Sequence, residues 1–184
     1  MALEIRLRPL TAEAFAPFGD VIEAAGASEL INRGTARQFA DLARIEVAAA
    51  GGRPRVSIIQ ATAVRLPFSV RLLERHPLSS QCFVPLARER LIVIVAPPGD
   101  SLEPQSIRAF LSDGRQGVNY RPGTWHHPLL AYGAAGDFLV IDRAGSGDNC
   151  EERALEEHGI VVLGPGKPGS LNRRRGRRSR TSAR

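Results

Sequence analysis

Residues 117–130 read Gly-Val-Asn-Tyr-Arg-Pro-Gly-Thr-Trp-His-His-Pro-Leu-Leu. A Pro-Gly turn separates two short β-like runs, 118–120 and 129–132, which is the pattern of strands joined by a tight connection. If residues 125–128 begin a strand, neighbouring side chains point to opposite faces of the sheet. Only one of His126 and His127 can then enter the interior of a barrel.

Similar short runs recur after Gly51-Gly52, rich in Val, Ile and Phe and separated by Gly, Pro, Asp or Ser. They cover residues 56–63, 68–73, 82–86, 91–96, 106–111, 118–120, 129–132, 138–142 and 160–163. With 18 Gly and 13 Pro in the chain, this pattern favours an all-β sandwich or closed barrel over a helical bundle. A short helix is expected from an N-cap at Thr11 through Phe15 and Phe18 to Gly19.

The length of 184 residues is typical of one domain, and 43% hydrophobic with 24% charged residues is ordinary for a globular protein. The net charge of +6 is located mainly at the end of the chain, because eight of the 25 basic residues follow Gly164 with no acidic residue among them. The remaining 17 basic residues face 19 acidic ones, so the body is slightly acidic. This distribution removes the argument for a nucleic-acid-binding domain.

We therefore expect a globular domain over residues 1–163 and a disordered basic tail over 164–184, which has no hydrophobic periodicity. The tail is either a solvated extension or an arm that contacts nucleic acid or another anionic surface. Two cysteines are too few for a disulfide framework. With no signal-peptide pattern and no aliphatic run of membrane-spanning length, we expect a soluble, cytoplasmic protein that does not bind membranes.

Three clusters carry side chains suited to chemistry: residues 117–130, residues 73–86 and residues 138–152. In the first, Gly123-x-x-His126 resembles part of the second cupin motif, whose histidine points into a small β-barrel, and this favours His126 over His127 as the inward residue. The alternative is a pair in which one imidazole is packed and the other is solvated. In the third, the run at 138–142 delivers Asp142 and Arg143 into a Gly-rich loop. Asp142 could orient an imidazole and Arg143 could bind a carboxylate, or the two could form a structural salt bridge.

The second cluster spans residues 73–86 and contains one histidine, His76, followed five residues later by Gln81. A metal-binding cupin would place His-x-His and a later Glu here, and a neutral amide is a poor substitute for a carboxylate at a transition-metal site. No cofactor is therefore certain, although His76 and His126 could share a divalent metal such as nickel or zinc. The alternative for residues 74–76 is a solvated, ion-paired turn.

Taken in order, several segments resemble the ureidoglycolate lyase family, also called ureidoglycolate hydrolase, over residues 3 to about 163. They include Glu-Arg-His-Pro-Leu at 74–78, Gly-Val-Asn-Tyr at 117–120, Gly-Thr-Trp-His-His-Pro at 123–128 and Ile-Asp-Arg at 141–143. The resemblance implies a cupin-like β-barrel, a double-stranded β-helix with a few short helices, that forms a homodimer. It also implies a carbon–nitrogen lyase of the amidine-lyase type, which releases urea and glyoxylate from ureidoglycolate in allantoin breakdown, a part of purine catabolism.

Cleaving this carbinolamine requires a base for its hydroxyl proton and an acid for the leaving urea nitrogen. We assign the base to His126, while Tyr120, His76 and Gln81 could donate to the leaving group or orient it. Arg143 or Arg121 could hold the substrate carboxylate. The remaining predicted binding residues are Trp125 and Asp142.

The chain departs from the family pattern at Gln38, Ala40, Gln60 and Arg121, where the family tends to have Arg, His, Arg and His. If the first three line the barrel mouth, lost charge-assisted hydrogen bonds would reduce activity. These departures favour an alternative, a diverged or repurposed cupin that binds a small carboxylate without catalysis and whose basic tail contacts nucleic acid.

Overall fold

The computed structural model describes residues 2–155 and 159–166, and most of its regular structure is β-strand. The aliphatic run at 91–96 lies in β11 (Arg90–Ala96) and is buried on both faces. Leu91, Val93 and Val95 belong to one hydrophobic core, whereas Ile92 and Ile94 belong to a second. Because alternate side chains of a strand point to opposite faces, β11 lies in a middle layer with a sheet on each side.

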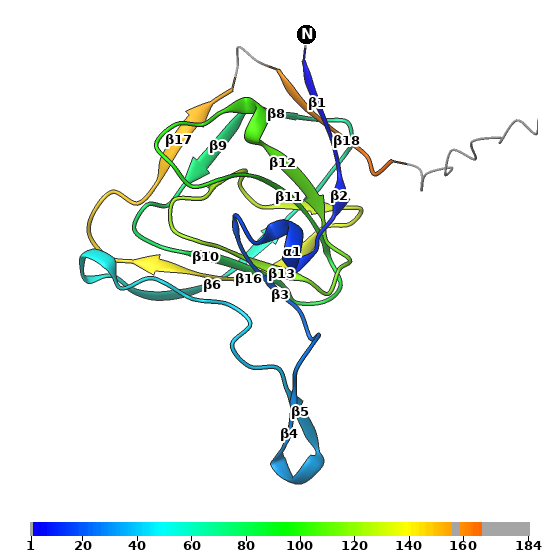
Figure 1. Cartoon of the computed structure of the whole chain (residues 1–184), viewed down its shortest axis with the longest axis vertical. Coiled ribbons are helices and arrows are strands. Elements are labelled where there is room, and N and C mark those ends of the chain that lie inside the picture. Colours follow the sequence, from blue (N-terminus) through cyan, green and yellow to red (C-terminus); the bar gives the residue numbers. More distant parts are fainter. Residues whose placement is uncertain (1, 156–158, 167–184) are drawn as a thin grey trace, which may run out of the picture.

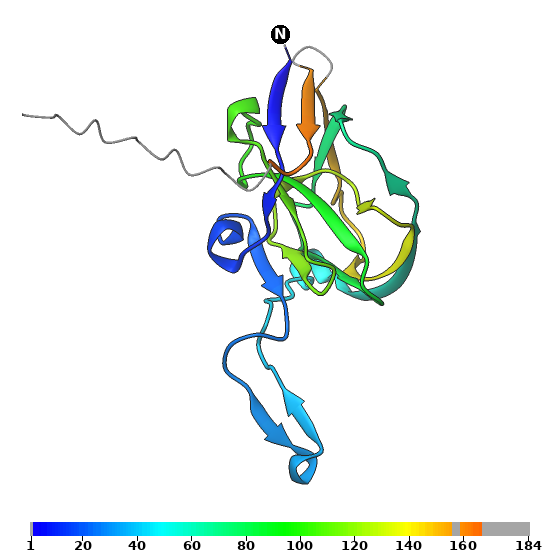
Figure 2. The ribbon, with the colours of Figure 1, turned by 90° about the vertical axis from the view of Figure 1, so that its right-hand side faces the viewer.

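Three sheets form these layers (Figures 1 and 2). The middle, eight-stranded sheet has the order β17 (Glu151–Ala154), β9 (Leu72–Arg75), β14 (Trp125–His126), β11, β12 (Arg108–Leu111) and β2 (Arg8–Pro9), with β15 (Leu130–Tyr132) pairing to β11 and β7 (Ala63–Val64) pairing to β15. On one side lies a three-stranded sheet of β1 (Leu3–Arg6), β18 (Ile160–Leu163) and β8 (Phe68–Val70). On the other lies a five-stranded sheet with the order β3 (Gly19–Ile22), β13 (Gly117–Tyr120), β10 (Gln81–Pro85), β16 (Gly136–Ala144) and β6 (Arg53–Ala61).

A hairpin of β4 (Glu29–Ile31) and β5 (Ala36–Gln38) extends beyond the barrel, and Figures 1 and 2 both show it as a projecting arm. Its tip is the 3-10 turn η1 (Asn32–Gly34), where Asn32 and Arg33 adopt the left-handed backbone with φ of 52° and 58°. Two further 3-10 turns are η2 (Ala49–Gly51) and η3 (Pro104–Ser106). The arm is absent from the predicted strands, since its short runs carry little hydrophobic alternation.

The helix α1 (Ala12–Phe15) begins as expected, because the Thr11 hydroxyl accepts a hydrogen bond from the Ala14 amide at 3.2 Å. It ends at Phe15 rather than near Gly19, and Phe15 packs into the core between the eight- and five-stranded sheets. The predicted all-β, cupin-like barrel is confirmed. The predicted tail beyond Gly166 lies outside the described residues.

Candidate active site

The register of two antiparallel strands brings Glu74 and His126 side by side. His126 of β14 is paired directly with Glu74 of β9, so both side chains lie on the same face of the eight-stranded sheet. Trp125, one residue earlier, belongs to the core on the other face. The prediction that His126 points inward is therefore confirmed, while the His127 ring lies 5.2 Å from Phe68.

His126 is almost fully buried, and its ring is fixed at both nitrogens. Its Nδ1 lies 2.9 Å from the carbonyl of Thr124, which can only accept, so Nδ1 carries the hydrogen. Its Nε2 lies 2.9 Å from Gln81 Oε1 and 3.4 Å from Glu74 Oε1, and both oxygens are acceptors. Tyr120 stacks on the ring, with centroids 4.3 Å apart and an interplanar angle of 20°. In the arrangement shown, Nε2 also faces acceptors and donates when it carries a hydrogen; in the neutral ring with Nδ1–H, the lone pair is at Nε2.

His76 follows β9 and contributes a second imidazole, whose ring lies 5.2 Å from that of His126. Its Nδ1 donates to the carbonyl of Asn149 at 2.5 Å. Its Nε2 is buried without a hydrogen-bond partner and lies 3.8 Å from Glu74 Oε1. A buried polar atom without a partner costs free energy, so this nitrogen is suited to a ligand that the cavity receives.

The environment moves the pKa values of the two histidines in opposite directions. Burial lowers the pKa of His126, and the nearby charge of His76 also lowers it, against the opposing effect of Glu74. Burial also opposes the charged form of His76, but Glu74 and the Asn149 carbonyl outweigh it and raise the pKa. Burial would raise the pKa of Glu74, yet hydrogen bonds from His126 and His76 and their charge lower it to about 2. Burial first, and the Glu74 charge second, raise the pKa of Tyr120 and keep its hydroxyl protonated.

Glu74, His76 and His126 offer three ligand atoms that lie within 4.8 Å of one another. In both imidazole rings, Nδ1 is fixed on a backbone carbonyl, which leaves Nε2 as the possible ligand atom. Two such nitrogens and one carboxylate oxygen form a donor set that suits a divalent transition metal. The partnerless Nε2 of His76 is the observation that favours such a fit. Glu74 is thus a third candidate ligand beside the two histidines expected from the sequence.

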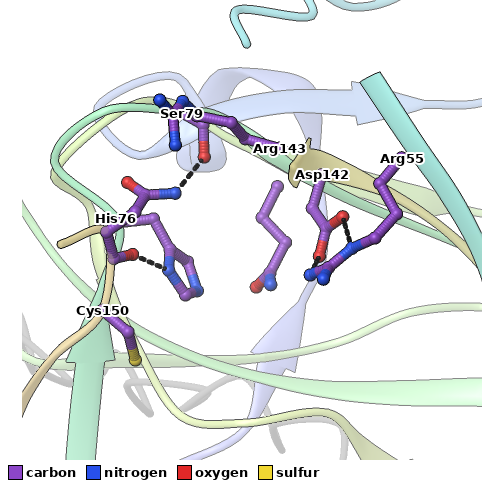
Figure 3. Close-up of a pocket in the computed structure, with 8 residues that line it drawn as sticks. Arg55, His76, Ser79, Asp142, Arg143 and Cys150 are labelled. Atoms are coloured by element: carbon purple, nitrogen blue, oxygen red, sulfur yellow. Dashed lines mark hydrogen bonds and ion pairs between the residues drawn. The ribbon is translucent and has the colours of Figure 1, made fainter. Parts of the chain in front are cut away.

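A cavity of about 240 Å³ opens beside these residues, and Figure 3 shows part of its lining. The lining is polar throughout: Arg55, His76, Ser79, Gln81, Asp142, Arg143, Asn149 and Cys150. Arg55 Nε and Nη2 donate to the two carboxylate oxygens of Asp142 at 2.8 and 2.6 Å. The cavity is smaller than the ~300–1,000 Å³ of sites for drug-sized ligands, so it suits a small polar molecule.

The two arginines predicted to bind the substrate carboxylate both donate to backbone carbonyls, and only Arg143 lies at the cavity. Arg143 lines the cavity but is buried, and its guanidinium donates to the carbonyls of Ala49, Ala50 and Ser146. Its role is to hold two loops together. Arg121 is absent from the cavity lining, and its Nη2 donates to the carbonyl of Ala16 at 2.7 Å.

Trp125 is also reassigned, because it is fully buried in the core away from the cavity. Its Nε1 donates to the Gly99 carbonyl at 2.9 Å, and the Arg75 guanidinium lies 4.9 Å from its ring centroid. Asp142 lies at the cavity as expected, but it binds Arg55 rather than an imidazole. Of the predicted residues, the structure brings together His126, Tyr120, His76 and Gln81.

Three of the departures from the family pattern lie outside the cavity of their own chain. Gln38 is on the arm, and Ala40 follows it in an exposed position. Gln60 is exposed on β6 and donates to Asp137 at 3.0 Å. The expectation that these residues line the barrel mouth is therefore wrong for a single chain, because β6 points Gln60 away from the face that carries Arg55.

Sequence reasoning missed two residues that the site depends on. Glu74 was considered only within an ion-paired turn, although alternation along Leu73-Glu74 places it opposite a buried leucine and so on the cavity side. Arg55 belongs to no motif, and only the pairing of β6 with β16 brings it to Asp142. That long-range register has no local signal in the sequence.

A cupin-like β-barrel in which His76 lines a small polar cavity and is grouped with Glu74 and His126 has the features of a small-molecule enzyme. The family model described as ureidoglycolate lyase matches residues 2–162. The chain belongs to this family. A ureidoglycolate lyase of Burkholderia mallei is 54% identical over 154 residues, covering 83% of this chain and 90% of that protein. Ureidoglycolate lyases of Pseudomonas aeruginosa and Pseudomonas entomophila are 49% and 48% identical over 162 residues, covering 88% of this chain and 96% and 97% of theirs.

Proposed function

We propose that this chain is a ureidoglycolate lyase that cleaves ureidoglycolate to glyoxylate and urea in purine catabolism. The observation that carries the proposal is the pair of imidazoles. His76 lines a small polar cavity, and His126 lies behind this lining, with its Nε2 2.9 Å from the lining residue Gln81 and with Glu74 close to both rings. Family membership supplies the substrate class. The polar lining and the presence of Arg55 suit a small substrate that is hydroxylated, amide-containing and anionic.

Cleavage breaks the bond between the hydroxyl-bearing carbon and a urea nitrogen. The base takes the hydroxyl proton, the oxygen electrons form the glyoxylate carbonyl, and the carbon–nitrogen electron pair passes to nitrogen, which accepts a proton. His126 suits the base, because its Nδ1–H is fixed on Thr124 and the lone pair of the neutral ring is at Nε2. The opposite pKa shifts of the two rings support a protonated His76 as the acid.

Other residues orient the rings and the substrate. Glu74 stabilises positive charge on the imidazoles at 3.4 and 3.8 Å, and the stacked Tyr120 ring restricts rotation of His126. Arg55 has an exposed side chain, whereas Arg143 is buried among carbonyls, so we assign Arg55 to the substrate carboxylate. Asp142 holds its Nε and Nη2, which leaves Nη1 directed to other partners.

The same three side chains, Glu74, His76 and His126, could hold a divalent cation such as nickel or zinc. Such a cation would act as a Lewis acid on the substrate oxygens. In that state Arg55 keeps its role in binding the carboxylate, and Tyr120 remains a protonated donor beside His126.

Release of urea and glyoxylate by the purified protein tests the reaction directly. We expect His126→Ala to lower turnover by ~10²–10⁴-fold, the usual contribution of a general acid or base. His127→Ala removes the neighbouring imidazole, which faces Phe68 instead, and should retain turnover. Unchanged turnover in His126→Ala would remove that residue from the mechanism. No product from the unmodified protein would contradict the proposed function.

A chelator distinguishes the two states of the site. Undiminished turnover after chelation supports proton transfer by the imidazoles alone, whereas loss restored by nickel or zinc supports the cation.

No helix within residues 2–155 and 159–166 is long and apolar enough to span a membrane. We place the enzyme in the cytoplasm, where its two cysteines would remain free thiols.

A further inference from the structure

Asn149 holds the turn that follows β9 by three hydrogen bonds. Its backbone carbonyl accepts from His76 Nδ1, its side-chain Oδ1 accepts from the Leu78 amide at 2.8 Å, and its Nδ2 lies 2.9 Å from Ser79 Oγ. The turn itself is closed by the Ser79 amide, which donates to the His76 carbonyl at 3.4 Å. His76, Ser79 and Asn149 all line the cavity. A single residue of the Gly-rich loop therefore positions two side chains of the cavity wall.

These contacts determine the direction of the hydrogen bond between Asn149 and Ser79. A backbone N–H can only donate, so the Asn149 atom that faces the Leu78 amide must be the oxygen of its side-chain amide. The nitrogen of that amide then faces Ser79 and donates to Oγ. Because the Ser79 oxygen accepts this bond, the hydrogen of its hydroxyl needs an acceptor elsewhere.

The Ser79 hydroxyl finds no such acceptor in the part of the chain that the structure describes. No hydrogen bond within residues 2–155 and 159–166 has Ser79 Oγ as its donor, although Ser79 is only 2% exposed. The neighbouring Ser80 is equally buried, but its Oγ accepts from the Glu46 amide and donates to the Glu46 carbonyl. A buried donor without an acceptor costs free energy. Since Ser79 lines the cavity, a ligand in the cavity is the acceptor available to it.

Ser79 and His76 lie across the cavity from the pair of Arg55 and Asp142 (Figure 3). The proposed function assigns Arg55 to the substrate carboxylate and His76 to the leaving urea nitrogen. The carbonyl oxygen of the ureido group is two bonds away from that nitrogen. Because Ser79 shares a hydrogen-bonded turn with His76, a substrate in this orientation presents its ureido oxygen on the Ser79 side of the cavity.

We propose that Ser79 determines specificity for the ureido group by donating its hydroxyl hydrogen to the ureido carbonyl oxygen, and that Asn149 is the positioning residue that directs this hydrogen. The inference rests on the proposed function and names the substrate group that this side of the site recognises. When the carbon–nitrogen bond breaks, the electron pair that passes to nitrogen is shared with the carbonyl oxygen until nitrogen takes its proton from His76. A donor at that oxygen therefore binds the transition state more strongly than the substrate.

Titration with N-carbamoylglycine tests the contact without turnover. This probe has the carboxylate and the ureido group of ureidoglycolate but lacks the hydroxyl whose proton the reaction removes, so it is not cleaved. Ser79→Ala should raise its Kd by ~3- to 10-fold, the value of one neutral hydrogen bond. The Kd of glycolate, which has no ureido group, should stay the same. The kcat/KM for ureidoglycolate should fall by a larger factor than the Kd of the probe rises.

Ser80→Ala is the matched control, because it removes a buried hydroxyl from the next residue, outside the cavity lining. It should lower the melting temperature through its lost bonds to Glu46 but keep the Kd of N-carbamoylglycine. An unchanged Kd in Ser79→Ala, or no binding of the probe by the unmodified protein, would overturn the proposal. Binding that depends on Ser79 in a protein that releases no urea would instead contradict only the proposed function.

A double-mutant cycle tests Asn149. In Asn149→Asp, one carboxylate oxygen still accepts from the Leu78 amide, while the other accepts the Ser79 hydrogen and turns it away from the ligand. The change should raise the Kd of N-carbamoylglycine in the presence of Ser79. It should raise this Kd by a smaller factor in the Ser79→Ala background, where only the added charge acts. Equal factors in the two backgrounds would show that Asn149 does not direct the hydroxyl.

Discussion

Arg55 and Asp142 hold each other by two charge-assisted hydrogen bonds, and the proposed binding of the substrate carboxylate depends on this pair. Since the pair leaves Nη1 unassigned, Arg55→Gln should raise the KM for ureidoglycolate by ~10- to 100-fold, the value of one hydrogen bond to a charged group. Steady-state urea release measures the effect. Arg55→Lys keeps the positive charge but lacks the planar guanidinium, so its KM should lie between those of the unmodified protein and Arg55→Gln.

Arg53→Gln is the matched control for Arg55, because it lies on the same strand two residues away and outside the cavity lining. It should retain the KM of the unmodified protein. Equal effects of the two arginine changes would show that general surface charge, rather than a specific contact, attracts the substrate.

Glu74 should make the fold sensitive to acid. Its pKa of about 2 lies below the ordinary 4.5, so between these values the unfolded chain binds more protons than the folded one. The stabilisation is complete above about pH 4.5 and is lost as the pH falls toward 2. Denaturant midpoints measured with chelator present should fall less steeply over this range in Glu74→Gln.

Glu4→Gln is the control for that measurement, since Glu4 is exposed on β1, away from Glu74 on β9. It should follow the unmodified protein. An equal slope in all three proteins would mean that other carboxylates dominate the acid transition.

Single residues differ in how far the sequence could place them. Alternation showed that only one of His126 and His127 could point inward, and the resemblance of Gly123-x-x-His126 to the cupin motif identified His126 as that residue. The roles of Arg121 and Arg143 could not be predicted in this way, since a guanidinium takes whichever carbonyls the loops bring near it. Those loops are distant in the sequence and come together only in the folded chain.

At the level of elements, β11 should carry more of the stability than any exposed strand. Ile94 is 1% exposed in the core between the eight- and three-stranded sheets, so Ile94→Ala should cost ~2–5 kcal/mol through lost burial and a residual cavity. Chemical denaturation measures this loss. Leu86→Ala, at a site 53% exposed, should cost far less, and similar losses would contradict the layered core.

Elements with a strong hydrophobic run could be predicted from the sequence, and those without one could not. The run at 91–96 became β11, but the polar β17 and the arm gave no signal, because pairing with another strand rather than burial creates them. The predicted run at 68–73 is divided into β8 and β9, which belong to different sheets. Alternation cannot show such a change of sheet.

For the whole molecule, we predict that residues 167–184 are dispensable for folding and for urea release. They contain a single aliphatic residue larger than alanine, Leu171, among many arginines. A chain ending at Gly166 should keep its melting temperature within a few degrees. A larger drop would show that the segment packs on the barrel. If it binds nucleic acid, only the full chain should show affinity that falls steeply with salt.

Trp125 is the sole tryptophan of the sequence, and its indole is sealed in the core one residue away from His126. Tryptophan fluorescence, excited selectively over that of the two tyrosines, therefore comes from one indole in one environment. Any shift of β14 that accompanies occupation of the cavity would change the emission of that single indole. The strand that supplies the imidazole thus provides a built-in optical reporter, readable in stopped-flow without labelling.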